Sequence, residues 1–278
     1  MKRSEFTKEM FIREMMVVAS EFGKAEITEV NKPTGSYTGI TIRKPGVPSP
    51  VVNIDRLYIA YQEGKLLMAD CKERVRKILV LKGDDMDFEF NIKDIGVWNI
   101  VKNQLYLRLV NNDANGISRE IADMFLVPYI RVVSDDSAAV RVTKELIDLW
   151  GVSEEEVFAQ AETNQEDIRP LKIDTLGNAL GLPCPFDVFI ISTTNNVNGA
   201  SAIFYEGVLE DLYDRLGEFY IIPSSVHEML AIAKENVDDP EDLKMMVMTV
   251  NANDVNVEDR LTDSIYTFNI DDKEFRKV

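Results

Sequence analysis

The pattern of apolar positions predicts that the chain opens with a helix. Over residues 4–22 apolar side chains recur every three or four positions, which is the spacing of one helix face. These side chains are Phe11, Met15, Val18 and Phe22. Gly23 is expected to end the helix, and β-rich runs at 25–31 and 37–44 then predict a hairpin. Two further helices are predicted over residues 55–62 and 65–81.

The middle of the chain mixes strand and helix patterns. Strands are predicted at 104–110, 125–133 and 139–142, and helices at 143–149 and 153–164. Pro128 cannot donate a backbone hydrogen bond, so we expect its strand to lie at a sheet edge or to contain a bulge. Ser153 and Glu156 have the spacing of a capping box, which places a helix start at this point.

The last third has the most regular pattern, after an irregular stretch at 165–185. Strands are predicted at 186–193, 200–205, 219–222, 227–233 and 264–269, with helices at 208–217 and 239–250. The predicted core stripe of the second helix is Leu243, Met246, Val247 and Val250. The connections in this ββαββαβ order are too short for a crossover between every pair of strands. We therefore predict an α+β fold with antiparallel sheets and with helices packed mainly on one face.

Breaks in the pattern suggest three regions. We predict an N-terminal region of helices and a hairpin over 1–83, a middle α+β region over 84–170, and an antiparallel sheet unit over 171–278. The boundaries are placed at Asp84-Asp85 and at the irregular stretch near Pro170. The length of the chain allows these regions to form either one or two compact domains.

Composition indicates a globular protein of the cytoplasm. Of the 278 residues 45% are apolar, yet no apolar run approaches the ~20 residues that span a bilayer. The N-terminus leads into the amphipathic helix without the apolar segment of a signal peptide. Cys71 and Cys184 lie far apart in the sequence, which suits reduced thiols better than a disulfide framework. We expect a cytoplasmic protein that does not associate with membranes.

Charge is distributed unevenly along the chain. The net charge is −17, but residues 1–82 hold 15 lysines and arginines against 10 acidic residues, whereas the remainder holds 16 against 38. Such an acidic field repels a phosphate backbone, so we do not expect direct nucleic-acid binding. The basic residues of the helix over 65–81 are interpreted as solvated surface or as partners for the chain's own acids. They are Lys72, Arg74, Arg76 and Lys77.

The sequence contains none of the common nucleotide, zinc-protease or hydrolase motifs. It has no Walker loop, no His-Glu-x-x-His and no Gly-x-Ser-x-Gly. The spacing of Asp85, Asp87 and Glu89 superficially resembles a calcium loop, but the required glycine and distant glutamate are missing. A single histidine and two distant cysteines disfavour zinc. We predict no cofactor and no metal, although a magnesium or calcium site built from scattered carboxylates stays open.

The candidate site residues are Ser224, Ser225, His227 and Glu228, around the only histidine of the chain. A serine–histidine pair requires the hydroxyl within hydrogen-bond reach of the imidazole, with a carboxylate on the far ring nitrogen. On an extended strand Ser225 and His227 are too far apart for this, and only a turn would bring them together. The interpretation that we favour is structural: one of the serines caps a turn, and His227 forms a hydrogen bond with a neighbouring backbone carbonyl.

The segment Pro223-Ser224-Ser225-Val226-His227-Glu228 resembles the Pro-Ser-Ser-x-His-Glu box of an uncharacterised bacterial family, often encoded on mobile elements and known as a domain of unknown function. Residues 106–111, 199–202 and 255–266 fit the same family pattern, so the resemblance covers most of the chain. The segment from Val142 to Asn164 is more weakly similar to the YtpQ-like bacterial family. Neither family has a settled function, so both resemblances imply an architecture and no catalytic residue.

Three functional hypotheses follow. The first is a non-catalytic, protein-binding or regulatory module of a bacterial mobile element. The second is a hydrolase-like enzyme centred on the serines, His227 and Glu228. In the third, the acidic face imitates nucleic acid and blocks a defence enzyme. We favour the first, which implies a protein partner; the sequence says nothing of oligomeric state.

Overall fold

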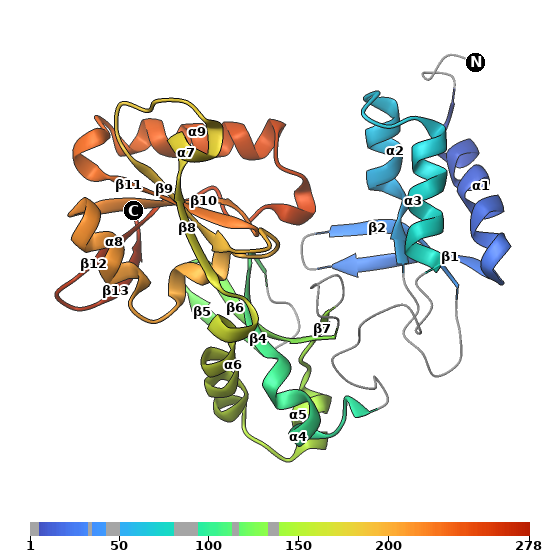
Figure 1. Cartoon of the computed structure of the whole chain (residues 1–278), viewed down its shortest axis with the longest axis horizontal. Helices are drawn as coiled ribbons and strands as arrows, with labels where there is room; N and C mark the ends of the chain where they lie inside the picture. The colour runs from blue at the N-terminus through green and yellow to red at the C-terminus, as the bar shows by residue number, and fades with distance from the viewer. Residues whose placement is uncertain (1–5, 33–34, 43–50, 81–93, 113–116, 133–138) are drawn as a thin grey trace. The chain divides into compact units, whose positions relative to one another are not determined.

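The computed structural model describes residues 6–32, 35–42, 51–80, 94–112, 117–132 and 139–278. The chain divides into two compact units, Met1–Lys93 and Asp94–Val278 (Figure 1). The predicted division at 83/84 and 170/171 remains a prediction, and Asp84-Asp85 lie outside the described residues. Asp85, Asp87 and Glu89 lie outside them as well. Among the described residues no helix has both the length and the apolar character needed to cross a membrane.

The first unit packs three helices on a small antiparallel sheet. Its helices are α1 (Lys8–Ala19), α2 (Ile54–Gln62) and α3 (Met68–Val80), with a short 3₁₀ turn η2 (Ser20–Phe22). The sheet has the order β1 (Ala25–Lys32), β2 (Gly35–Ile42), β3 (Val51–Asn53). Its core holds Phe11 and Met15 from α1, Ile40 from β2 and Val75 from α3, all fully buried. The predicted amphipathic helix and hairpin are therefore confirmed.

The basic face of α3 is partly neutralised within its own unit. Lys72 Nζ lies 2.6 Å from a carboxylate oxygen of Glu14, and Arg76 Nη2 lies 3.1 Å from one of Glu21. Glu14 belongs to α1 and Glu21 to η2, the turn that follows it. At these two positions the basic residues bind the chain's own carboxylates, in agreement with one of the two interpretations made from the sequence.

The second unit contains two antiparallel sheets. The four-stranded sheet is built from β4 (Leu105–Val110), β5 (Arg119–Ile121), β6 (Met124–Arg131) and β7 (Ala139–Arg141). Its helical segments are α4 (Trp98–Val101), η4 (Lys102–Gln104), α5 (Lys144–Trp150) and α6 (Glu154–Ile168). The capping box of Ser153 and Glu156 is present at the start of α6, with distances of 2.8 and 3.2 Å. This local prediction is confirmed.

Pro128 does not lie in an edge strand, and the prediction from its missing N–H was wrong. It is in β6, the strand that pairs with β4 on one side and with β5 and β7 on the other. The carbonyl of Pro128 accepts from Val142 N, so the side of β6 on which its N–H would point is the β5 and β7 side. On this side β6 pairs with β5 as far as Leu126 and with β7 from Tyr129 onward, so Pro128 lies between the two stretches of strand pairing.

The six-stranded sheet has the order β13-β12-β10-β11-β9-β8. Its strands are β8 (Leu171–Thr175), β9 (Val188–Thr193), β10 (Phe219–Ser225), β11 (Glu228–Ala233), β12 (Tyr266–Asn269) and β13 (Glu274–Lys277). The helical segments between them are α7 (Leu176–Leu180), η5 (Ala200–Phe204), α8 (Val208–Leu216), η6 (Lys234–Asn236), α9 (Pro240–Asn253) and η7 (Val257–Asp259). The α+β fold with antiparallel sheets is confirmed.

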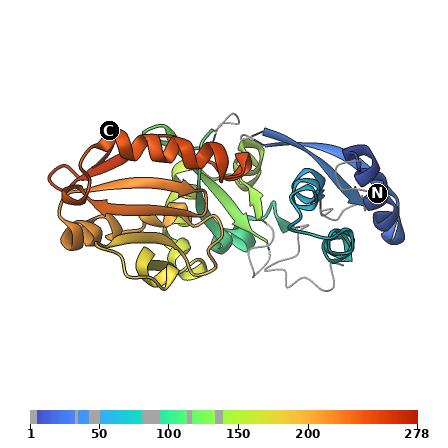
Figure 2. The same cartoon turned by 90° about the horizontal axis from the view of Figure 1, so that it is seen from above.

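Helices lie on both faces of this sheet, where the sequence favoured one. Leu243 and Val247 of α9 pack on Ile222 and Ile232, and Figure 2 shows the orange-red α9 along this face. On the opposite face Arg215 of α8 lies over the ring of Phe189. The segment 200–205 is wrongly predicted as a strand, because Ala200–Phe204 forms a buried 3₁₀ helix. The predicted order ββαββαβ was therefore wrong. The observed order is β8, α7, β9, η5, α8, β10, β11, η6, α9, η7, β12, β13.

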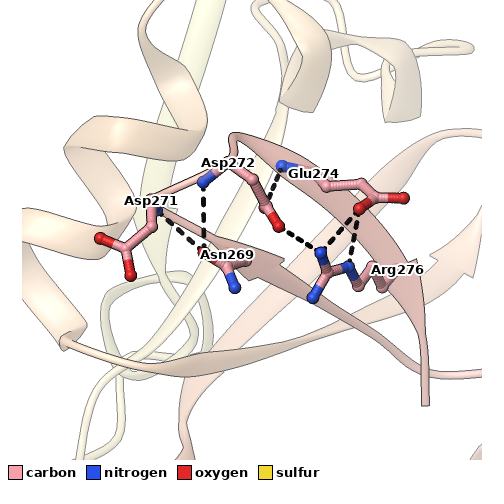
Figure 3. A network of polar contacts seen from close by, with 5 residues as sticks. All are labelled: Asn269, Asp271, Asp272, Glu274 and Arg276. Carbon is pink, nitrogen blue, oxygen red and sulfur yellow. Dashed lines mark hydrogen bonds and ion pairs between the residues drawn. The ribbon is translucent and has the colours of Figure 1, made fainter.

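The hairpin of β12 and β13 closes the sheet with a polar network (Figure 3). Asn269 Oδ1 accepts from the backbone N–H of Asp271 at 2.9 Å and of Asp272 at 3.4 Å. Arg276 donates to the carboxylates of Asp272 and Glu274. The Asn269 side chain thus accepts the hydrogen bonds that the backbone N–H groups of the turn donate. The hydrogen bond to Glu274 is the main cause that raises the pKa of the Arg276 guanidinium.

Candidate functional site

His227 lies in the tight turn between β10 and β11. The register of the two strands shifts between Pro223 and Ser225, and Ser225 then pairs with Glu228. The hydroxyl of Ser225 accepts from the backbone N–H of His227 at 3.1 Å, which holds the turn. Ser224 donates to Glu228 Oε1 at 3.1 Å. The four predicted site residues are therefore close together, and both serine hydroxyls bind within the turn.

The imidazole of His227 connects three segments of the chain. Its Nδ1 accepts from the backbone N–H of Asn198 at 2.9 Å, and its Nε2 lies 3.4 Å from Oδ1 of Asp259. The carbonyl of His227 accepts from Ser192 Oγ at 2.8 Å and from Gly199 N at 3.1 Å. A ring nitrogen that accepts a hydrogen bond carries no proton, so the neutral ring holds its proton on Nε2, towards Asp259.

This arrangement resembles a catalytic triad on one side only. A histidine base has a carboxylate on one ring nitrogen and the nucleophile's hydroxyl on the other. Here Asp259 fills the first position, but the N–H of Asn198 takes the place of the hydroxyl. Because that N–H donates, Nδ1 cannot take a proton from a serine without first losing this bond. The geometry favours a structural role for His227, which holds the segments of Asn198 and Asp259 together. The side chain of His227 is 35% exposed.

A second polar cluster surrounds Asp123, in the turn between β5 and β6. Its carboxylate accepts from Ser264 Oγ at 2.8 Å, from Lys277 Nζ at 2.7 Å and from the hydroxyl of Tyr266. The hydroxyl of Tyr266 also accepts a hydrogen bond from the hydroxyl of Thr262 at 2.6 Å. The cluster joins the four-stranded sheet to β12 and β13, and its serine, tyrosine and lysine all bind one carboxylate.

Hydrogen bonds decide the ionisation of this cluster. Burial alone would raise the pKa of Asp123, but hydrogen bonds from Lys277, Tyr266 and Ser264 outweigh it and hold the pKa below its ordinary value of 3.8. Burial and the hydrogen bond to Asp123 raise the pKa of Tyr266 well above its ordinary range. The carboxylate is thus the stable anion and the tyrosine the stable neutral donor.

We expect Asp123→Asn to lower the free energy of unfolding of the second unit by about 1–2 kcal/mol at pH 7, because three donors lose a charged acceptor. The stabilisation by Asp123 exists above pH 3.8 and disappears as the pH falls towards the lower folded-state pKa. The wild type should therefore lose more stability than the variant between about pH 5 and 3.

Urea titrations measured by tryptophan fluorescence test this prediction, because Trp98 and Trp150, the only tryptophans, both belong to the second unit. Asp271→Asn is the control, since this exposed carboxylate lies in the hairpin turn of Figure 3. Equal stability of Asp123→Asn and Asp271→Asn at pH 7 would contradict the prediction.

The reverse side of the histidine turn borders an apolar groove of about 80 Å³. Ile222, Pro223 and Leu230 form its sheet side, and Met246 and Val250 of α9 form its other side. Met246 is 51% and Val250 41% exposed, so their predicted place in the core stripe was wrong. The buried residues of α9 are Leu243, Val247 and Asn251, whose amide donates to Thr262 O and Asp263.

Comparison with family models finds one match, which spans residues 4–270 and is described as a family of unknown function, DUF5688. The chain belongs to the DUF5688 family. This confirms the predicted membership in a domain-of-unknown-function family, whereas the specific box and the YtpQ-like similarity stay predictions. No curated protein and no solved structure matches the chain.

Sequence reasoning found part of this DUF5688 site. The box singled out His227, but this residue was predicted to begin the strand over 227–233 and lies instead in the turn between β10 and β11. Its partners Asn198 and Asp259 were missed because they come from distant segments of the chain. Asp123 was missed too, since 141 residues separate it from Ser264. A local signal did exist for α9: three exposed methionines, Met245, Met246 and Met248, crowd into one turn.

Within the part of the chain that the structure describes, no group of three or more histidine, cysteine or acidic residues could hold a metal ion. Cys71 is buried and Cys184 exposed, and neither forms a disulfide. The described residues therefore do not bring together the histidine and cysteine ligands of a zinc-type site.

Proposed function

We propose that this protein is a non-catalytic binding module that accepts a segment of another protein in the groove between α9 and β10. The observation that carries the proposal is the exposed apolar pair Met246 and Val250, one helical turn apart on the same flank of α9. They continue the apolar wall formed by Ile222 and Leu230. Methionine side chains are flexible and polarisable, and they recur on surfaces that bind peptides.

Charge specifies the chemistry of the partner. Asp239, Glu241 and Asp242 stand at the start of α9, and Asp254 follows its end. Apolar anchors in the groove are thus flanked by carboxylates at both ends of the helix. The complementary ligand is an amphipathic segment with apolar residues on one face and lysine or arginine at its ends. A second copy of this chain fits less well, because its net charge of −17 would oppose association.

We expect a synthetic amphipathic peptide of leucine and lysine to bind the wild-type protein and to bind Met246→Asp at least about tenfold more weakly, which corresponds to about 1.4 kcal/mol. Isothermal titration calorimetry measures both affinities. Met248→Asp is the matched control: it adds the same charge to the same helix, but Met248 is not part of the groove wall.

Equal weakening by the two variants would indicate general attraction to the acidic surface and would contradict the groove as the binding site. Sedimentation of the protein alone tests the alternative occupant, since a dimer that Met246→Asp dissociates would assign the groove to a second copy. The association with a mobile element, the cytoplasmic location, the hydrolase hypothesis and the nucleic-acid mimic stay predictions from the sequence.

A further inference from the structure

The backbone of His227 is held independently of its ring. Its N–H donates to Ser225 Oγ at 3.1 Å, and its carbonyl accepts from Ser192 Oγ at 2.8 Å and from Gly199 N at 3.1 Å. None of these three hydrogen bonds involves the imidazole, so none of them depends on its protonation. The backbone of the turn between β10 and β11 is therefore fixed whatever the charge of the ring.

The loop between β9 and η5, which donates to the ring, is held in the same way. The carbonyl of Val197 accepts from Nη2 of the buried Arg169, and the N–H of Val197 donates to Asn195 Oδ1 at 3.1 Å. The next peptide N–H, that of Asn198, donates to His227 Nδ1. Because a guanidinium keeps its charge in proteins, the bond from Arg169 does not respond to pH. Only the bond to the imidazole does.

Protonation of the imidazole places two N–H groups face to face. The neutral ring accepts at Nδ1 from the N–H of Asn198 across 2.9 Å and carries its own proton on Nε2. The second proton of an imidazolium goes to Nδ1, so both nitrogens of this contact are then donors and the hydrogen bond is lost. Histidine ordinarily changes its charge between about pH 5 and 8. The conflict therefore arises within the physiological range of pH.

The carboxylate that faces the ring lies on its other side. Oδ1 of Asp259, in η7, is 3.4 Å from His227 Nε2, and the side chain of Asp259 is 15% exposed. The loop between β9 and η5 has no titratable residue. An imidazolium is thus repelled by the N–H of Asn198 and attracted by Asp259. The other charged groups of the segments around the ring are Arg169, Lys172, Glu228, Glu258 and Arg260.

We propose that His227 is a pH-operated latch between the turn that carries it and the loop that joins β9 to η5. The neutral ring closes the latch by connecting Asn198 to Asp259. Protonation breaks the bond to Asn198, and the imidazole is the part that moves, because other bonds hold both backbones. The ring, on a side chain that is 35% exposed, turns towards Asp259, and the N–H of Asn198 opens to water. The latch does not depend on the function proposed for the groove at α9.

Nitrogen and amide-proton NMR of the isotope-labelled full chain tests the latch, because the imidazole signals of a protein with one histidine are unambiguous. Between about pH 8 and 5 the ring should gain its second proton, and the amide proton of Asn198 should move to lower frequency with the same midpoint. The amide of Asn196, which donates to Thr193 O at 2.8 Å, should stay in place. The hydrogen-exchange rate of the Asn198 amide, relative to that of Asn196, should rise at least about tenfold.

Two variants separate the histidine from other groups that titrate in this range. His227→Gln keeps an oxygen that can accept from Asn198 but does not titrate, so the Asn198 amide should become independent of pH. Asp259→Asn removes the charge beside the ring and should lower the midpoint by at least about 0.5 pH unit. Asp271→Asn, the same change at an exposed residue between β12 and β13, should leave the midpoint unchanged.

Three results would overturn the proposal. They are an Asn198 amide that stays in place while the imidazole titrates, an imidazole that remains neutral down to about pH 5, and an Asn198 shift that persists in His227→Gln. If His227→Gln does not fold, the wild-type titration and the comparison of Asp259→Asn with Asp271→Asn still decide between latch and fixed contact. Equal midpoints in those two variants would contradict the attraction of the ring by Asp259.

Discussion

Arg169→Ala is expected to destabilise the second unit by about 3–5 kcal/mol. Arg169 is 2% exposed and follows the last turn of α6. Its guanidinium lies 4.5 Å from the ring centre of Tyr106, and its Nη2 donates to Thr193 Oγ1 at 3.3 Å and to the carbonyl of Val197. Alanine removes the stacking and the donors and leaves a void in the core.

The backbone of Arg169 makes a further contact, which the alanine variant would keep. Its carbonyl accepts from the hydroxyl of Tyr205 at 3.1 Å, so the residue connects α6 to both β9 and η5. Arg169→Lys should recover only part of the loss, because an ammonium cannot stack flat on Tyr106 while it donates to Val197.

Urea titration followed by tryptophan fluorescence measures the change. Arg215→Ala is the control, since Arg215 also lies over an aromatic ring, that of Phe189 at 5.6 Å, but its side chain is 48% exposed. We expect the control to lose about 1 kcal/mol or less. A loss for Arg169→Ala no larger than that of Arg215→Ala would contradict the structural role assigned to Arg169.

Gly199→Ala should cost about 3 kcal/mol, because there is no space for one additional methyl group. A Cβ at this position would lie 2.4 Å from Ser192 Oγ, 2.6 Å from Thr193 N and 2.9 Å from His227 O. Two of these three atoms belong to the backbone, so no side-chain rotation relieves the clash. The loop before η5 would have to move away from the histidine turn, which breaks the bond from Gly199 N to His227 O.

The single histidine gives this prediction a second readout. Nitrogen NMR of the imidazole should show an unprotonated Nδ1 in the wild type, and Gly199→Ala should change that signal as Asn198 moves. Gly96→Ala is the control, because its Cβ would meet only the side chain of Leu149, which is 66% exposed and free to rotate. An unchanged imidazole signal together with unchanged stability in Gly199→Ala would contradict the close approach.

Elements specified by local sequence were predicted well. The capping box at Ser153 acts through neighbouring residues, so its signal is complete in a short window. The apolar run at 200–205 has no such local determinant. In this run the hydroxyl of Ser201 donates to the carbonyl of Leu107 in the four-stranded sheet, and the run forms a 3₁₀ helix. A contact between residues so far apart in the sequence leaves no trace in the local apolar pattern.

Edge strands and site contacts were the parts that a single sequence could not supply. β8 is a short run of five residues directly after Pro170, and β13 is rich in charge; each lies at a sheet edge and pairs with a single neighbour. For the site, the box pointed to His227 and its neighbours, but not to the turn in which His227 lies. The groove was not, because the periodicity of α9 could not tell which flank of the helix would be covered.

The thioethers of α9 expose this surface to oxidation. Met245, Met246 and Met248 are between 46% and 61% exposed, whereas Met15, Met124 and Met229 are fully buried. Peroxide reaches exposed sulfur first and converts it to a polar sulfoxide. A cell under oxidative stress would therefore make the wall of the α9 groove hydrophilic at Met246 while the interior stays intact, and methionine sulfoxide reductases would restore it.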